Sequence, residues 1–93
     1  MQTYYVYILT NKTHSVLYTG VTRDLQKRIQ EHKEEAHAKS FTSRYKVTKL
    51  VWYAYFHDIE TAIQYEKRIK RWRRQWKINL IEKENPRWED LSL

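Results

Sequence analysis

Residues 4–21 read YYVYILTNKTHSVLYTGV, and this stretch decides the fold. Residues 4–9 and residues 16–21 are rich in β-branched, aromatic and aliphatic side chains, which favour strands. The segment between them, TNKTHS, consists of polar turn-forming residues. The stretch therefore predicts a β-hairpin.

The fold can be extended outward from this hairpin. Residues 49–56, KLVWYAYF, predict a third strand. Capping residues and helical spacing predict three helices. The first is capped by Thr22 or Asp24 and runs to about Ala36. The second covers Ile59–Arg71 with Asp58 as its cap, and the third covers residues 73–83. The resulting order, ββαβαα, is an α+β fold, in which helices flank a three-stranded, mainly antiparallel sheet. Residues 37–47 are expected to form a loop, and Asn85-Pro86 is expected to start a further helix with Asn85 as its cap.

The composition favours a nucleic-acid partner. The 93 residues carry a formal net charge of +7 and include eight tyrosines and four tryptophans. Basic residues interleaved with aromatic ones favour nucleic acid over an anionic membrane. The absence of cysteine excludes disulfides and thiolate zinc sites and fits a cytoplasmic setting. No apolar run approaches the roughly 20 residues of a membrane span, and the first residues lack the basic region of a signal peptide.

Polar side chains fall on the inner face of the first helix. Leu25 and Ile29 mark that face, and at about 100° per residue His32 lies near its centre, with Arg28 at its edge. Arg28 and His32 are four residues apart, so their side chains are neighbours. On this pattern alone, a half-exposed helix with an extended arginine side chain is the more ordinary explanation.

The second helix repeats this anomaly at Glu66. The inner face of this helix is marked by Ile59, Ala62, Ile63 and Ile69. A buried carboxylate is costly unless it has a cation, a metal ion or water beside it. Lys70, four residues further on, is the ordinary partner, so an ion pair and a metal site are both open.

The hairpin brings tyrosines and a glycine onto shared faces. Tyr5, Tyr7 and Leu9 share one face of the first strand, and Tyr18 and Gly20 share one face of the second. Tyrosines in strands are usually packing residues. Gly20 is the only glycine in the chain, and inside a strand it indicates a bulge, a close approach by another group, or a simple turn at the strand end.

Together these residues resemble the GIY-YIG nucleases. Tyr5-Val6-Tyr7 and Tyr18-Thr19-Gly20 look like the two halves of the family motif, although the glycine of the first half is absent. The family pattern is also met by Arg28, ten residues after Tyr18, by His32 one turn later, and by Glu66 on a helix after the third strand. The ending NPRWEDL resembles the small single-domain bacterial branch, so residues 1–93 are expected to form one nuclease domain, similar to the nuclease domains of the bacterial excision-repair endonuclease and of homing endonucleases.

The resemblance implies a metal-dependent endonuclease that hydrolyses phosphodiester bonds in DNA, in repair or processing. By resemblance, Tyr7 and Tyr18 orient or activate the attacking water, with Tyr18 as the first choice for the general base. Arg28 holds a phosphoryl oxygen, and His32 assists the proton relay or places the phosphate. Glu66 is the single protein ligand of one Mg²⁺ or Mn²⁺ ion. The family also has an asparagine near the end of the domain, which matches either Asn79 or Asn85.

A basic segment follows Glu66. Residues 67–77 read KRIKRWRRQWK, with seven basic residues and no acid. Contacts to the DNA backbone are expected from basic residues of this segment and of the central loop, namely Lys39, Arg44, Lys67, Arg68, Lys70, Arg71 and Arg74. Trp72 and Trp76 are expected to lie mainly in the core. No base-reading element is visible, which predicts weak sequence preference.

Three other functions fit the sequence. They are a nucleic-acid-binding module of the same fold with little catalysis, an RNA-directed protein, and a protein-interaction domain that uses its aromatic surface. Metal-dependent cleavage that Glu66→Ala removes would favour the nuclease, and binding that ignores salt would favour the interaction domain. The chain is compatible with a monomer or a transient dimer on DNA, and its protein partners are open.

Overall fold

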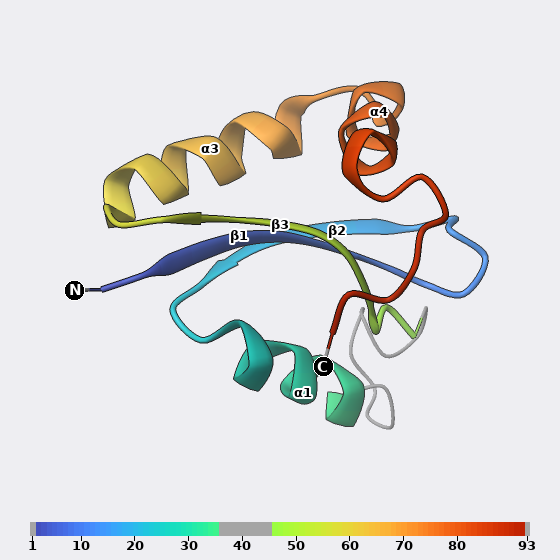
Figure 1. Ribbon diagram of the computed structural model, residues 1–93, viewed down its shortest axis with the longest axis horizontal. Coiled ribbons are helices and arrows are strands. Elements are labelled where there is room, and N and C mark those ends of the chain that lie inside the picture. Colours follow the sequence, from blue (N-terminus) through green and yellow to red (C-terminus); the bar gives the residue numbers. More distant parts are fainter. Residues whose placement is uncertain (1, 36–45, 93) are drawn as a thin grey trace.

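The computed structural model describes residues 2–35 and 46–92. Its elements are β1 (Tyr4–Thr10), β2 (Leu17–Thr22), α1 (Leu25–Glu35), β3 (Lys49–Phe56), α3 (Ile59–Arg71) and α4 (Arg74–Glu84). This order confirms the predicted ββαβαα arrangement (Figure 1). Within the described ranges, no helix is long and apolar enough to cross a membrane.

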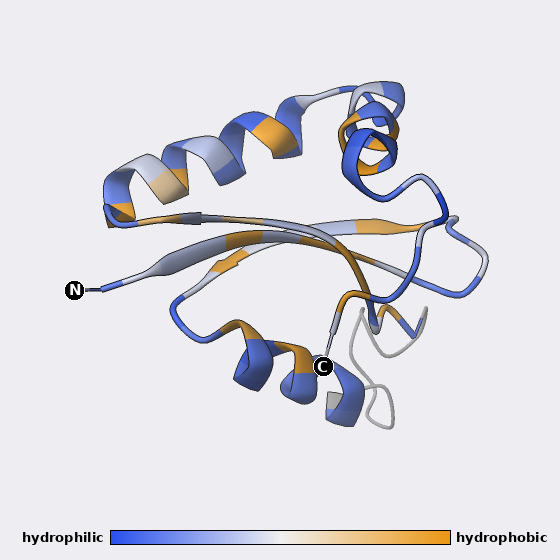
Figure 2. Ribbon diagram, in the orientation of Figure 1, coloured by the Kyte–Doolittle hydropathy of each residue, from blue (hydrophilic) through white to orange (hydrophobic). Residues whose placement is uncertain are grey.

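One antiparallel sheet, in the order β2-β1-β3, separates two apolar layers. Alternation along β1 turns Val6 and Ile8 toward one face and Tyr7 and Leu9 toward the other. In Figure 1, α3 and α4 cover the first face and α1 covers the second. Figure 2 shows that the apolar residues of α1 gather on the side turned toward the sheet. The sheet therefore lies in the middle, covered by helices on both faces.

Local capping sets the start of two helices. Asp24, rather than Thr22, caps α1, because its carboxylate accepts a hydrogen bond from the backbone N–H of Lys27 at 3.1 Å. Asp58 caps α3 in the same way through the N–H of Thr61, at 2.9 Å. These two caps fix where the helices that carry the polar residues begin.

The predicted helix start at Asn85-Pro86 is wrong. Asn85 ends α4, since its backbone N–H donates to the carbonyl of Ile81 at 2.7 Å, and no helix follows over residues 86–92. Its side-chain amide donates to the carbonyls of Val51 at 3.0 Å and Glu89 at 2.9 Å. The side chain thus joins β3 to the segment after α4 instead of capping a helix.

Replacing Asn85 by alanine is expected to lower the free energy of unfolding by about 1–3 kcal/mol, because the buried carbonyl of Val51 loses its donor. Urea unfolding measures this change. Asn79→Ala is the matched control, since Asn79 is exposed and accepts only a hydrogen bond from Gln75. It should change stability by less than about 0.5 kcal/mol. An Asn85→Ala protein as stable as wild type would contradict this role.

The C-terminal segment closes one end of the β3 edge. The backbone N–H of Leu91 donates to the carbonyl of Leu50 at 2.7 Å, and the N–H of Leu50 donates to the carboxylate of Asp90 at 3.2 Å. The segment then continues to the side of α1, where the ammonium of Lys33 lies 3.3 Å from the hydroxyl of Ser92 (Figure 1). The end of the described chain therefore lies beside the first helix.

Candidate active site

Two tyrosines of the hairpin lie on the face of the sheet that α1 covers. Tyr7 is opposite Gly20 and Tyr18 is opposite Leu9 in the β1–β2 register. The ring centroids of Tyr7 and Tyr18 are 6.4 Å apart. Tyr7 is 1% exposed, whereas Tyr18 is half-buried. Tyr18 is thus the tyrosine with greater access to solvent.

Gly20 allows the Tyr7 ring to lie against β2. A Cβ atom at this position would stand 2.5 Å from Cζ of Tyr7 and would overlap its hydroxyl. Gly20 lies inside β2 and has no positive φ angle, so the glycine is required by close approach rather than by a turn. The hydroxyl of Tyr7 consequently reaches over the edge strand of the sheet.

His32 and Arg28 meet these tyrosines from one side of α1. His32 is 1% exposed, and its Nε2 lies 3.5 Å from the hydroxyl of Tyr7, at the outer limit of a hydrogen bond. Its ring packs edge-on against both tyrosines, with centroid distances of 6.2 Å to Tyr7 and 5.0 Å to Tyr18. The four-residue spacing of Arg28 and His32 thus brings both side chains to one place.

Arg28 links the cluster through its guanidinium. It lies close enough to the hydroxyls of Tyr7 and Tyr18 to interact with both, and it forms an ion pair with Glu31 at 3.4 Å. Burial alone would lower the pKa of Arg28, but its interactions with these tyrosines and with Glu31 outweigh burial and hold the pKa above its usual value. Sequence reasoning missed Glu31, although its spacing of three residues from Arg28 on one helix was a usable signal.

Glu66 approaches the cluster from α3, which covers the opposite face of the sheet. It lies on α3, is 8% exposed, and forms an ion pair with the ammonium of Lys70 at 2.8 Å. Its carboxylate is close enough to Tyr7 to raise the pKa of that hydroxyl. The buried carboxylate therefore has the cation that burial requires, supplied here by Lys70.

Glu66 is the carboxylate beside the cluster that could contribute to a divalent-metal site. In residues 2–35 and 46–92, no three His, Asp or Glu side chains gather into a potential metal site. Mg²⁺ needs only one or two carboxylates and keeps several water ligands. A lone Glu66 carboxylate would meet that minimum, and the ammonium of Lys70 lies 2.8 Å from one of its oxygens.

The hydroxyl of Tyr7 stays protonated at neutral pH. Burial is the main cause that raises its pKa from 10.0 to about 12; Tyr18 and Glu66 add to the rise, while Arg28 opposes it. A group with a raised pKa in the folded state stabilises the fold while it is protonated. This contribution is fully present below the unfolded pKa of 10.0 and is lost as pH rises through about 12.

The free energy of unfolding is therefore expected to fall between about pH 10 and pH 12 more steeply in wild type than in Tyr7→Phe. Urea unfolding at several pH values in this range measures both slopes. The difference between the slopes is the contribution of Tyr7, because the lysines that titrate in the same range are present in both proteins. Tyr55→Phe is the matched control, because Tyr55 is 64% exposed, and it should keep the wild-type slope. Equal slopes in wild type and Tyr7→Phe would contradict the assignment.

Three of the predicted phosphate contacts, Lys67, Arg68 and Arg71, are exposed on the C-terminal half of α3. Arg74, at the start of α4, is also exposed, and its guanidinium donates to the carbonyl of His14. A shallow groove of about 370 Å³ crosses this surface, lined by Gln64, Lys67, Arg68, Arg71 and Trp72. Lys70 is held by Glu66 at 2.8 Å, and Lys39 and Arg44 lie outside the described residues.

Trp76 corrects the expectation that both tryptophans are core residues. Trp72 is half-buried, whereas Trp76 is 53% exposed. Its ring packs edge-on against Trp72 at 6.1 Å, and the guanidinium of Arg73 stands over it at 5.8 Å. Contacts along the helix surface thus shield part of the ring without burying it in the core.

Three comparisons relate the chain to known proteins. Residues 3–79 match the model of the GIY-YIG catalytic domain. A UPF0213 protein of Syntrophus aciditrophicus is 37% identical over 84 residues, covering 88% of this chain and 92% of the relative. A UPF0213 protein of Clostridium perfringens is 43% identical over 77 residues, covering 83% and 81%. The solution NMR structure of a UPF0213 protein from Bacillus halodurans is similar in fold, with a TM-score of 0.59, 32% identity, and 95% and 92% of the two chains covered.

Proposed function

Because this chain belongs to the GIY-YIG catalytic domain family, we propose that it is an endonuclease that hydrolyses phosphodiester bonds in DNA, with one Mg²⁺ or Mn²⁺ ion, in the cytoplasm. The observation that carries the proposal is the meeting of Tyr7, Tyr18, Arg28 and His32 in one cluster of neighbouring side chains. Polar groups are costly to bury unless they have polar partners, and titratable groups with strongly shifted pKa values cluster at functional sites.

The residues divide the chemical work among them. Arg28 is always charged and offers a fork of donors, so it can hold a phosphoryl oxygen while it orients both tyrosines. Tyr7 is protonated, which suits it to donate a hydrogen bond to the attacking water or the phosphate. Tyr18 is the more accessible hydroxyl and is the candidate general base. His32 contacts Tyr7 and can take up or return a proton.

Glu66 would hold the divalent ion. When bound, the ion polarises the phosphate and stabilises the departing oxygen. The ammonium of Lys70 lies 2.8 Å from one oxygen of this carboxylate and would have to give way for that oxygen to serve as a metal ligand. Lys70, once displaced, becomes available for a phosphate, beside the exposed Lys67, Arg68, Arg71 and Arg74.

Lys70→Met is therefore expected to tighten Mn²⁺ binding about two- to fivefold, since a partly exposed ion pair contributes about 0.5–1 kcal/mol. Titration of the protein with Mn²⁺, followed by the EPR signal of the free ion, gives the dissociation constant. Lys67→Met removes the same charge from an exposed neighbour and should leave the constant within about twofold of wild type. Equal constants for wild type and Lys70→Met would contradict competition between Lys70 and the ion for Glu66.

The same ion pair favours a second candidate, a nucleic-acid-binding module that does not cut. Glu66 has a partner without any metal ion, so the buried carboxylate does not by itself require one. A module of this kind would use the basic surface of α3 and α4 and would bind phosphate in a salt-dependent way.

Incubating the protein with labelled single-stranded, duplex and branched DNA, and with RNA of the same sequences, separates the candidates. We expect DNA cleavage with Mg²⁺ or Mn²⁺, because water is the attacking group and no 2′-hydroxyl is needed. We expect none with EDTA, because EDTA removes the metal ion. Cleavage confined to RNA would move the function to RNA. Salt-sensitive binding without cleavage of any substrate would leave the binding module.

A further inference from the structure

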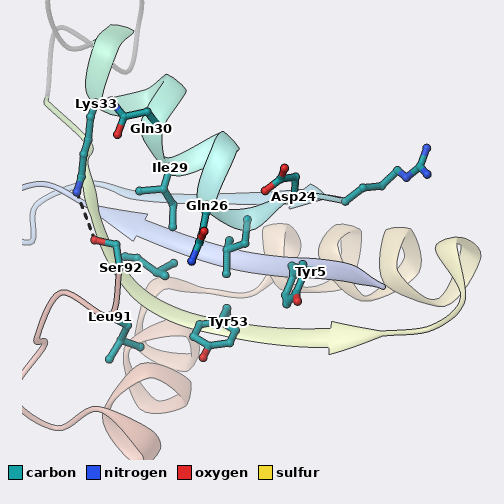
Figure 3. Close-up of a pocket in the computed structure, with 12 residues that line it drawn as sticks. Tyr5, Asp24, Gln26, Ile29, Gln30, Lys33, Tyr53, Leu91 and Ser92 are labelled. Carbon is teal, nitrogen blue, oxygen red and sulfur yellow. Dashed lines mark hydrogen bonds between the residues drawn. The ribbon is translucent and has the colours of Figure 1, made fainter. Parts of the chain in front are cut away.

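A second groove runs along α1 on the side away from Arg28 and His32. It encloses about 590 Å³, within the range of ligand-binding sites. Figure 3 shows Tyr5 and Tyr53 on the sheet beneath α1, with Gln26 and Gln30 on the helix above them. At one end, Lys33 reaches from α1 to Ser92 of the C-terminal segment. Sheet, helix and C-terminal segment thus form three sides of the groove.

The floor of the groove is aromatic. Tyr5 and Tyr53 pack edge to face, with ring centroids 6.3 Å apart, and Tyr53 is 42% exposed. Tyr53 is the cross-strand partner of Tyr7, and Tyr5 lies two residues before Tyr7 on the same face of β1. The floor is therefore continuous with the tyrosine at the centre of the candidate active site.

The walls carry amides between two cations. Gln26 and Gln30 are exposed and are neighbours on the helix surface. Arg23 lines the groove near the start of α1, and Lys33 lies about 10 Å along the helix from Gln26. The ammonium of Lys33 has three protons, gives one to Ser92 and also attracts the carboxylate of Asp90.

The lining holds one carboxylate against two cations. Asp24 lines the groove, and its carboxylate accepts the backbone N–H of Lys27 as the cap of α1. The remaining lining residues are apolar or neutral, namely Leu25, Ile29, Leu50, Leu91 and Ser92. Charge, amides and aromatic rings together match a short stretch of phosphate-linked bases.

We propose that this groove binds an unpaired segment of the nucleic acid that the enzyme cuts, which rests on the function proposed above. Bases stack on the exposed face of Tyr53, the amides of Gln26 and Gln30 bond base edges, and Arg23 and Lys33 contact phosphates. In a duplex the faces of the bases are covered by their neighbours, so only an unpaired strand can use the tyrosine. The preferred substrate thus has a single-stranded portion beside the cut.

Fluorescence anisotropy with a labelled thymidine decamer in EDTA measures this binding without cleavage. Tyr53→Ala is expected to weaken binding at least about fivefold, because a lost base stack has an effect of that size. Tyr53→Phe keeps the aromatic face and should bind within about twofold of wild type. Tyr55→Ala is the matched control, since Tyr55 is two residues further along β3, is 64% exposed and does not line this groove. It should bind as wild type does.

The proposal is supported if Tyr53→Ala binds the decamer more weakly than wild type but binds duplex equally well, and if Tyr53→Phe binds the decamer as wild type does. Equal affinities of wild type and Tyr53→Ala, or equal losses in Tyr53→Ala and Tyr55→Ala, would overturn it. A uridine decamer run in parallel distinguishes RNA from DNA as the unpaired strand. If Tyr53→Ala weakens binding but wild type shows no metal-dependent cleavage, only the proposed nuclease activity is refuted. If wild type cleaves DNA but Tyr53→Ala binds the decamer unchanged, only the proposed role of the groove is refuted.

Discussion

Gly20→Ala is expected to lower the free energy of unfolding by about 1–3 kcal/mol and to remove most cleavage activity. The added Cβ would stand 2.5 Å from Cζ of Tyr7, which is far below normal contact. Tyr7 is 1% exposed and is held by Arg28 and His32, so its rigid ring has no room to move aside. Either β2 or the ring must shift, and each shift displaces the hydroxyl at the centre of the site.

A double-mutant cycle separates this clash from a general effect on β2. Leucine at position 7 ends before the ring atoms that meet the Cβ, so Gly20→Ala should cost little in a Tyr7→Leu background. Urea unfolding of the four proteins gives the coupling energy between the two positions. Wild-type stability and activity in Gly20→Ala would mean that the ring and β2 are not in close contact.

Glu66→Gln is expected to reduce DNA cleavage by at least about 100-fold while leaving the fold intact. Glutamine has the same shape and can still accept hydrogen bonds, but it lacks the charge that holds a divalent ion. Removing the charge of Glu66 leaves the ammonium of Lys70 without its ion-pair partner, but the Lys70 side chain is 53% exposed and can be solvated. Stability should consequently change little, and the loss of activity should come from the site itself.

Much of the fold was predictable because its signals are local. Alternation along residues 4–9 and capping at Asp58 depend on near neighbours, so strands and helices could be predicted without knowledge of their packing. Helical spacing alone brought Arg28 and His32 to one face, and the pair of Glu66 with Lys70 follows from their separation along α3.

The features that could not be predicted depend on distant contacts. Asn85 looks like a helix cap until its bond to Val51, 34 residues earlier in the chain, is known. The role of Gly20 depends on the register that sets it opposite Tyr7. The groove over Tyr53 requires the C-terminal segment to return to Leu50, which no local pattern indicates.

The most direct test compares single-turnover cleavage by wild type and Glu66→Gln on the DNA that wild type cuts fastest, with Mg²⁺, Mn²⁺ or EDTA. Glu60→Gln, on an exposed position of the same helix, is the matched control and should keep wild-type activity. The account predicts metal-dependent cleavage in wild type and Glu60→Gln that falls at least about 100-fold in Glu66→Gln. Wild-type cleavage rates in Glu66→Gln, or no cleavage of DNA by wild type with either metal, would contradict it.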